Sequence, residues 1–181
     1  MNPLSLIDKY FSSSLEAKKY LLIHSYKVAE KALEIALNCN FIKIDKEFLA
    51  ESALLHDIGI IGVNAPSIGC NGSEPYIKHG MIGFEILLAE GFPMHARVCK
   101  THIGVGLSEA EIISKNLPIP HENMLPESIE EKIVCFADKF YSKSEKYLLN
   151  PKPIELICDE MKKYGEANYT RFEELRSLFN I

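Results

Sequence analysis

The spacing of apolar residues constrains the fold of this chain most strongly. Along most of its length they recur every three or four positions, while the alternation typical of β-strands is hard to find. The pattern predicts an all-α fold. We expect α-helices at about 15–38, 46–57, 76–91, 93–102, 154–163 and 166–179, a short helix after Ser108, and a helix opened by Ser128 that carries Asp138.

Local signals set the expected ends of these helices. Ser13 to Glu16 and Ser108 to Glu111 have the form of capping boxes, and Ser128 with Glu131 is a third helix start. Asp45 is expected to cap the second helix, and Gly59 to stop it. Two segments rich in glycine, proline or asparagine, 62–75 and 116–126, are expected to be loops.

Bulk properties favour one soluble domain covering residues 1–181. The net charge of −5 argues against a dedicated nucleic-acid binder but leaves anionic small substrates open. Five widely spaced cysteines fit a reducing cytoplasm, and no apolar run approaches the roughly 18 residues of a membrane span. We therefore expect a cytoplasmic protein with no membrane or nucleic-acid partner. The last two helices either cap the core or pair with a second copy in a homodimer.

Six potential metal ligands follow one another along the expected helices. Two of them are adjacent, and counted from the first of that pair the successive gaps are 32, 23, 23 and 36 residues, each about one helix–loop–helix unit. His and Asp spread in this way favour an open catalytic site inside a helical bundle over a closed structural zinc site. Singly, each residue has an ordinary structural explanation, and the ordered set carries the prediction: His24, His56, Asp57, His79, His102 and Asp138.

This set resembles the HD-domain superfamily of metal-dependent phosphohydrolases, and the run from His56 to Gly59 matches the signature of its HDIG-type subgroup. The resemblance implies a helical bundle with the metal site in its interior, a core at about 14–141 and C-terminal helices at about 152–179. The stretches 102–106, 130–134 and 137–139 also resemble a largely uncharacterised HDIG subgroup.

The resemblance also implies a division of labour among the ligands. Residues matching His24, His56, Asp57 and Asp138 hold a first divalent metal ion. In dinuclear members, residues matching His79 and His102 hold a second, and the aspartate matching Asp57 bridges both. The ions would be Mn, Fe, Zn, Ni or Co, with Mg less favoured.

Two positions depart from the superfamily's cyclic-dinucleotide phosphodiesterases. Those enzymes commonly place lysine after the glycine of the motif and often double the later histidine, whereas Ile60 and Ile103 stand here. The departures disfavour cyclic-dinucleotide hydrolysis.

The resemblance therefore implies hydrolysis of a phosphate ester or anhydride, in a nucleotide or other small phosphorylated molecule, by a metal-activated hydroxide. Asp57 would be central to catalysis, Lys78 is the first candidate to stabilise the phosphoryl charge, and His95 could donate a proton to the leaving group. Weaker cationic candidates are Arg97, Lys100 and Lys139. Each of these cations could equally be a solvated surface residue, and His95 a surface residue at a helix start.

Two other functions use the same ligands. Some proteins that resemble this pattern hold a di-iron centre and oxidise C–H bonds with O₂. A third interpretation is a non-catalytic, metal-stabilised sensor or partner-binding module, although such modules usually lose ligands. The two long loops contribute little aromatic surface, only Tyr76 at one margin, so the sequence identifies no platform for a nucleobase.

Overall fold

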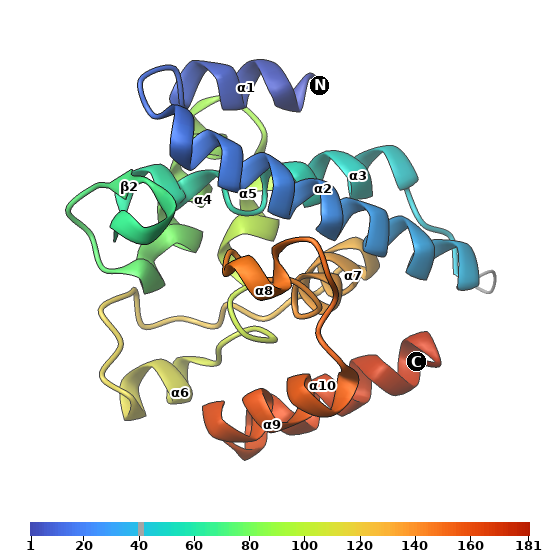
Figure 1. The fold of residues 1–181 in the computed structure, drawn as a ribbon. Helices are drawn as coiled ribbons and strands as arrows, with labels where there is room; N and C mark the ends of the chain where they lie inside the picture. Colours follow the sequence, from blue (N-terminus) through green and yellow to red (C-terminus); the bar gives the residue numbers. More distant parts are fainter. Residues whose placement is uncertain (40–41) are drawn as a thin grey trace.

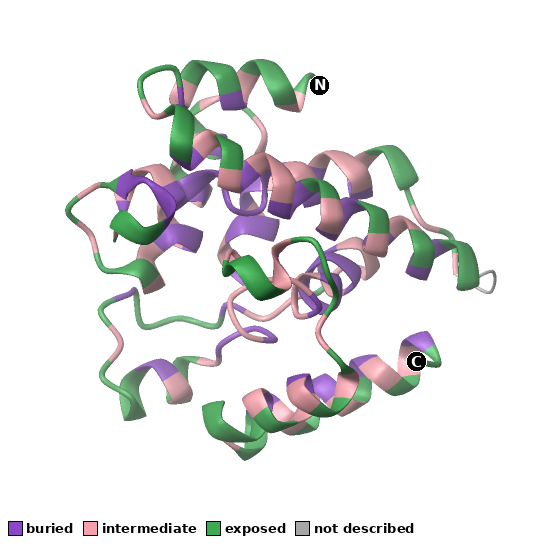
Figure 2. Ribbon diagram, in the orientation of Figure 1, coloured by how far each residue is buried: buried purple, intermediate pink, exposed green. Residues whose placement is uncertain are grey.

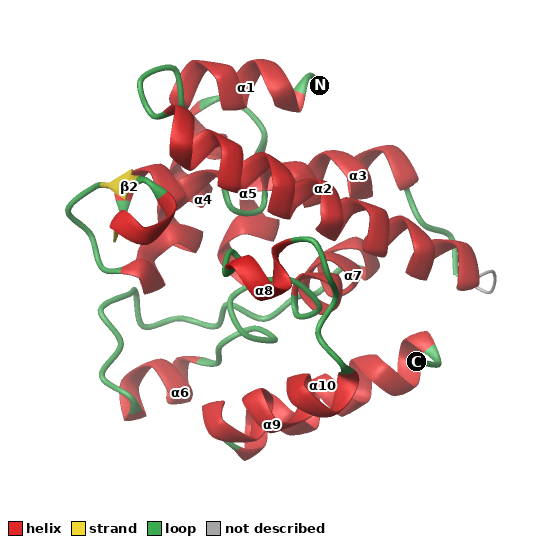
Figure 3. Cartoon of the chain, in the orientation of Figure 1, coloured by secondary structure: helices red, strands yellow, loops and turns green. Residues whose placement is uncertain are grey.

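The computed structural model describes residues 1–39 and 42–181 and consists of helices and loops with almost no strand (Figures 1 and 3). The α-helices of the described residues are α1 (Pro3–Tyr10), α2 (Leu15–Asn38), α3 (Lys46–Leu55), α4 (His79–Ala89), α5 (Pro93–Thr101), α6 (Glu109–Ser114), α7 (Ile129–Asp138), α8 (Glu145–Leu148), α9 (Ile154–Tyr164) and α10 (Glu166–Phe179). Short 3₁₀ helices are η1 (Ile58–Gly62), η2 (Pro66–Ile68) and η3 (Tyr76–Lys78), and the two strands are β1 (Asn64–Ala65) and β2 (Cys70–Asn71).

The long helix α2 organises the molecule. It packs against α3 and α7, while α4 packs against α5 and η1. Figure 1 shows α1 above this central group and the α9–α10 pair below it. Buried residues concentrate on the faces that the central helices turn toward one another (Figure 2). The prediction of an all-α fold is confirmed.

Two clusters of apolar side chains flank the middle of α2. One joins its C-terminal half to α3, α7, α9 and α10, and the other joins its N-terminal half to α1, η1, α4 and α5. His24 lies between them on the same inward face, 1% exposed. The core therefore brings polar residues to the centre of the bundle, where burial is costly unless they are paired or bound to an ion.

Three of the four predicted helix N-caps are present, and the one predicted at the start of α2 is wrong. Asp45 accepts a hydrogen bond from Phe48 N, and Ser108 forms a complete capping box with Glu111. Ser128 accepts from Glu131 N, but the Glu131 carboxylate binds Arg97 instead of closing the box. At α2 the N-cap is Ser14 rather than Ser13, and its side chain makes no capping bond.

Gly59 has a different role from the predicted helix stop. Helix α3 ends at Leu55, and Gly59 lies within η1. A Cβ atom at Gly59 would lie 2.0 Å from the carbonyl oxygen of His79 and 2.3 Å from Gly83 N. Glycine is therefore needed because the backbones of η1 and α4 touch, and this contact fixes His79 relative to Asp57.

The segment expected to be a loop at 62–75 folds back on itself, because Asn64 pairs with Asn71 and Ala65 with Cys70 across a small antiparallel ladder. The sequence analysis did not predict the short helices α1 and α8. None of the helices in the described residues is long and apolar enough to cross a membrane.

Candidate metal centre

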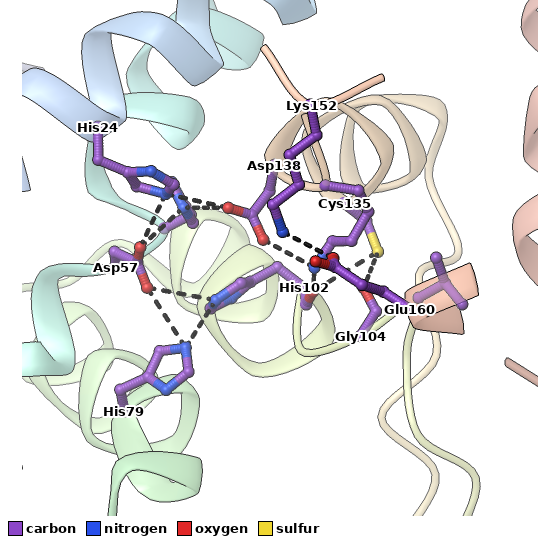
Figure 4. A network of polar contacts seen from close by, with 12 residues as sticks. His24, Asp57, His79, His102, Gly104, Cys135, Asp138, Lys152 and Glu160 are labelled. Carbon is purple, nitrogen blue, oxygen red and sulfur yellow. Dashed lines mark hydrogen bonds and ion pairs between the residues drawn. The ribbon is translucent and has the colours of Figure 1, made fainter. Parts of the chain in front are cut away.

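Each of the six predicted ligands comes from a different place in the bundle, apart from the adjacent pair. His24 lies in the middle of α2, and the pair His56–Asp57 directly follows α3. His79 is the first residue of α4, His102 follows the last residue of α5, and Asp138 ends α7. Figure 4 shows the side chains of five of them, His24, Asp57, His79, His102 and Asp138, pointing toward one another. The structure thus brings together all six residues that the sequence analysis selected: His24, His56, Asp57, His79, His102 and Asp138.

The first group of ligand atoms gathers around one oxygen of Asp57. His24 Nε2 lies 3.2 Å from Asp57 Oδ2 and 3.0 Å from Asp138 Oδ1. His56 Nε2 lies 3.1 Å and 3.5 Å from the same two oxygens. Two imidazoles and two carboxylates with ligand atoms within 4.8 Å of one another could hold a metal ion.

The second group gathers around the other oxygen of Asp57. His79 Nε2 and His102 Nε2 lie 3.3 Å and 3.4 Å from Asp57 Oδ1. These three residues form a separate set of ligand atoms that could also hold a metal ion. Asp57, only 2% exposed, belongs to both sets through different oxygens.

Backbone carbonyls orient three of the rings. Nδ1 of His56, His79 and His102 lies 2.7, 2.6 and 2.7 Å from the carbonyl oxygens of Ala53, Tyr76 and Cys99, respectively. A carbonyl can only accept, so each Nδ1 carries a proton and Nε2 is the nitrogen that faces the centre; in the neutral rings of His79 and His102 it presents a lone pair. This is the usual outer-shell arrangement around a metal-binding histidine.

Two of these lone pairs face each other. His79 Nε2 and His102 Nε2 are 2.9 Å apart. Burial lowers the pKa of both rings, that of His79 to about 3, so both are neutral. Since neither Nε2 has a proton to share, the contact is repulsive unless a cation lies between them and Asp57.

The two carboxylates make the centre strongly attractive to cations. Burial raises the pKa of Asp57, but the positive charges of Lys143 and His56 outweigh this effect. The net pKa lies well below the usual range, so the carboxylate stays ionised. Asp138 is held ionised in the same way by Lys139 and His24. Burial lowers the pKa of His56, yet Asp57 and Asp138 outweigh it and raise the value to about 9.

Buried polar atoms without partners complete the test of fit. Within residues 1–39 and 42–181, His56 Nε2 and Asp57 Oδ1 make no hydrogen bond, although both are shielded from solvent. A divalent transition-metal ion would satisfy both atoms and the facing lone pairs of the second group. The residues present therefore fit a metal.

Two lysines approach the carboxylates from the cavity side. Lys139 Nζ lies 2.7 Å from Asp138 Oδ2 and donates to the carbonyl oxygen of His102. Lys143 Nζ forms an ion pair with Asp57 Oδ2, and its side chain is 10% exposed. Lys139 was one of the weaker candidates from the sequence, and Lys143 was not predicted, because it lies in the segment between α7 and α8 with no motif around it.

The predicted catalytic residues Lys78 and His95 are not brought to the centre. Lys78 Nζ pairs with Glu74, 2.6 Å away, and is absent from the residues lining the cavity described below. His95 packs edge-on against Phe48, and its Nε2 lies 3.1 Å from Glu51.

The other two weaker candidates are also engaged in ion pairs elsewhere. Arg97 binds Glu131 and Glu127, and Lys100 binds Glu122. Neither cation lines the cavity.

The cluster opens into a cavity of about 430 Å³, which lies within the size range of small-molecule sites. Four lysines and three tyrosines line it, together with apolar residues. Tyr141 and Tyr164 join Tyr76 on its surface, so the cavity is richer in aromatic residues than the sequence analysis expected.

Comparison with known proteins agrees with this architecture. The family described as "HD domain" matches residues 21–142. The chain belongs to the HD domain family. All six converging residues of this HD domain lie within the matched range.

Among relatives, the chain is 34% identical over 145 residues to "Uncharacterized protein MJ0778" of Methanocaldococcus jannaschii, covering 78% of this chain and 73% of that protein. It is 31% identical over 163 residues to a "tRNA (cytidine(56)-2'-O)-methyltransferase" of Thermoplasma volcanium, covering 90% of this chain but 40% of the relative. A protein of the same name from Picrophilus torridus is 31% identical over 156 residues, which are 86% of this chain and 39% of the relative. This HD domain thus spans about two fifths of the named methyltransferases. No solved structure matches the chain.

Proposed function

We propose that the protein is a metal-dependent phosphohydrolase that cleaves a phosphate ester or anhydride of a nucleotide or other small phosphorylated molecule. One observation carries the proposal: the two oxygens of Asp57 close two separate sets of ligands at the end of a lysine-lined cavity. Paired cation sites that share a carboxylate suit the cleavage of phosphate esters.

His24, His56, Asp57 and Asp138 would hold one divalent ion, and His79, His102 and Asp57 a second. Bound there, the ions would supply positive charge for the phosphoryl oxygens and lower the pKa of water to near neutrality.

The residues of the chain do the remaining work. Lys143 lies beside Asp57 and faces the cavity, so its ammonium can bind a phosphoryl oxygen and stabilise the negative charge that develops there. Lys139 is held by Asp138 and the carbonyl of His102, which fixes its charge near the centre without leaving it free to move. Lys143 therefore takes the role that the sequence analysis gave to Lys78.

The methyltransferase name of two relatives gives no activity to this chain. That name describes proteins of which the matched segment makes up about 40%. Within the proposal, the five free cysteines are consistent with a reducing compartment such as the cytoplasm.

The test is phosphate release from p-nitrophenyl phosphate, measured after chelation and after adding Mn, Fe, Co, Ni, Zn or Mg separately. We expect release that depends on a transition metal and is lost in Asp57→Asn. Oxygen consumption with iron and no phosphate release would instead favour the oxygenase. Absence of both activities across substrates would favour a non-catalytic module.

A further inference from the structure

We infer that the part of the cavity beyond the carboxylates is a subsite for an aromatic ring, so that the substrate is a ring-bearing phosphate monoester with one phosphoryl group. The inference rests on the proposed function and concerns the part of the substrate that carries the phosphoryl group. Its evidence is the chemistry of the two walls of the cavity, the way they are fastened together, and the distribution of lysines.

The first wall is apolar and continuous. Ile77, Ile103, Leu107 and Leu117 line the cavity, and all four belong to one hydrophobic cluster with Ile112. Because their inner sides pack into that cluster, they present a supported apolar surface to the cavity. Such a surface gains free energy by covering the apolar part of a ligand and offers no partner to a charged one.

A second wall comes from α9. Met161 and Tyr164 line the cavity from this helix, and Tyr164 is 57% exposed. An exposed aromatic ring at the edge of an apolar cavity offers a flat surface on which another ring can stack. Both residues lie outside the range 21–142 that matches the family, so this wall is an addition of the C-terminal segment.

Hydrogen bonds from α10, which packs against α9, fasten this pair of helices to the segment that carries the first wall. Asn168 of α10 donates to Glu111, and its side-chain oxygen accepts from Val105 N. Arg171 donates to the carbonyl oxygens of Val105 and Gly106 and also binds Glu111.

Gly104 permits this contact. Its φ is +60°, and a Cβ atom there would lie 2.7 Å from Asn168 Oδ1. The ring subsite is therefore formed before a ligand arrives, which reduces the entropy cost of binding.

The lysines limit the number of phosphoryl groups. Of the four that line the cavity, Lys139 and Lys143 pair with Asp138 and Asp57 at the centre, and Lys152 pairs with Glu160 at 2.7 Å. The fourth, Lys115, donates to the carbonyl oxygen of Tyr164, and no ion pair to it is found in residues 1–39 and 42–181. A chain of phosphates would need several free cations along this path, whereas a single phosphoryl group needs only the centre.

The experiment measures binding separately from turnover. Titration calorimetry with the Mn-supplemented protein compares phenylphosphonate, methylphosphonate, a nucleoside 5′-phosphonate and pyrophosphate, none of the phosphonates having a phosphate ester to cleave. We expect phenylphosphonate to bind about tenfold more tightly than methylphosphonate, as a stacked ring would give. Tighter binding of the nucleoside compound identifies a nucleotide substrate, and weaker binding a smaller aryl ester.

Variants locate the effect. Tyr164→Ala should bring the two simple phosphonates to similar affinities, and Leu117→Asp should do the same from the other wall. Tyr26→Ala is the matched control, because Tyr26 is 47% exposed on α2 and does not line the cavity.

Equal affinity for phenylphosphonate and methylphosphonate, including no measurable binding of either, overturns the inference, as does tighter binding of pyrophosphate than of both. Failure of the proposed function looks different: ring-selective binding would persist without phosphate release from any ester.

Discussion

Asp57 shows most clearly what a single residue contributes to this molecule. Each of its oxygens faces a different pair of histidines, while a lysine approaches from the cavity. Loss of this carboxylate would remove an atom from both candidate ion sites at once. A residue such as His79 belongs to only one of the two ligand sets, so changing it tests one ion site without the other.

The number of metal ions per chain tests that separation. We expect His79→Ala to reduce the content from close to two ions toward one, because only the second set loses a ligand. Elemental analysis of protein purified without chelator measures this. His95→Ala is the control, since His95 is bound to Glu51 and should leave the content unchanged. One ion in both variants and in the unaltered protein would rule out the second site.

Lys143 and Lys78 give a second matched pair. Lys143→Met should lower kcat for phosphate release by about a hundredfold, the usual effect of removing a cation or donor that stabilises the transition state. Lys78→Met should change it less than twofold, because Lys78 pairs with Glu74 at the surface. Metal content and circular dichroism check that the Lys143 variant still folds around Asp57. Similar rates for the two variants would remove Lys143 from the proposed mechanism.

At this scale the sequence predicted the ligands better than the cations. A histidine or aspartate on an apolar helix face is costly to bury without a partner, so His24 and Asp138 became informative as members of the ordered set. A lysine side chain is long, and its direction depends on the loop that carries it. Lys78 precedes His79, yet one position along a helix rotates a side chain by about 100°, which turns Lys78 away from the centre.

Helices could be predicted from the sequence wherever the helical spacing of apolar residues continued over many residues. The long helix α2 and the α9–α10 pair lie close to their predicted ranges. Helix α1 has ordinary start signals in Asn2 and Pro3 but is only 8 residues long. The role of Gly59 could not be predicted, because it depends on a backbone contact with α4 that is distant in sequence.

The contact between α6 and α10 should make the stability of the fold depend on pH. Burial raises the pKa of Glu111, but hydrogen bonds from Arg171 and Ser108 outweigh it and lower the value to about 2. The unfolded chain has the ordinary value of 4.5, so it binds the proton more readily than the folded chain. This contribution to stability is therefore complete above about pH 4.5 and is lost as the pH falls toward 2.

Glu111→Gln should accordingly destabilise the protein at pH 7 but have little effect near pH 2. Urea unfolding at a series of pH values measures the difference in the free energy of unfolding. Glu109→Gln is the control, because the Glu109 side chain is exposed at the start of the same helix. A difference between Glu111→Gln and the unaltered protein that stays constant from pH 7 to 2 would contradict the pKa argument.

On the scale of the whole molecule, the bundle is closed around polar groups that lack partners. Two hydrophobic clusters meet at the cluster of His and Asp residues, and a third supports the cavity wall. The C-terminal wall was beyond sequence analysis, because amphipathic helices such as α9 and α10 reveal an apolar face without revealing what covers it. Ion binding at the centre should therefore be linked to the stability of the entire fold.

That linkage predicts a metal-dependent melting temperature. An ion that binds only the folded chain stabilises it by about 2.7 kcal/mol when present at 100 times its Kd, which for a chain of this length raises Tm by roughly 5–10 °C. Differential scanning fluorimetry after chelation and after Mn addition measures the shift. In Asp57→Asn both sets of ligands lose the carboxylate that they share, so the shift should disappear. An equal shift in that variant would mean that the stabilising ions bind elsewhere, and the facing lone pairs of His79 and His102 would then need another explanation.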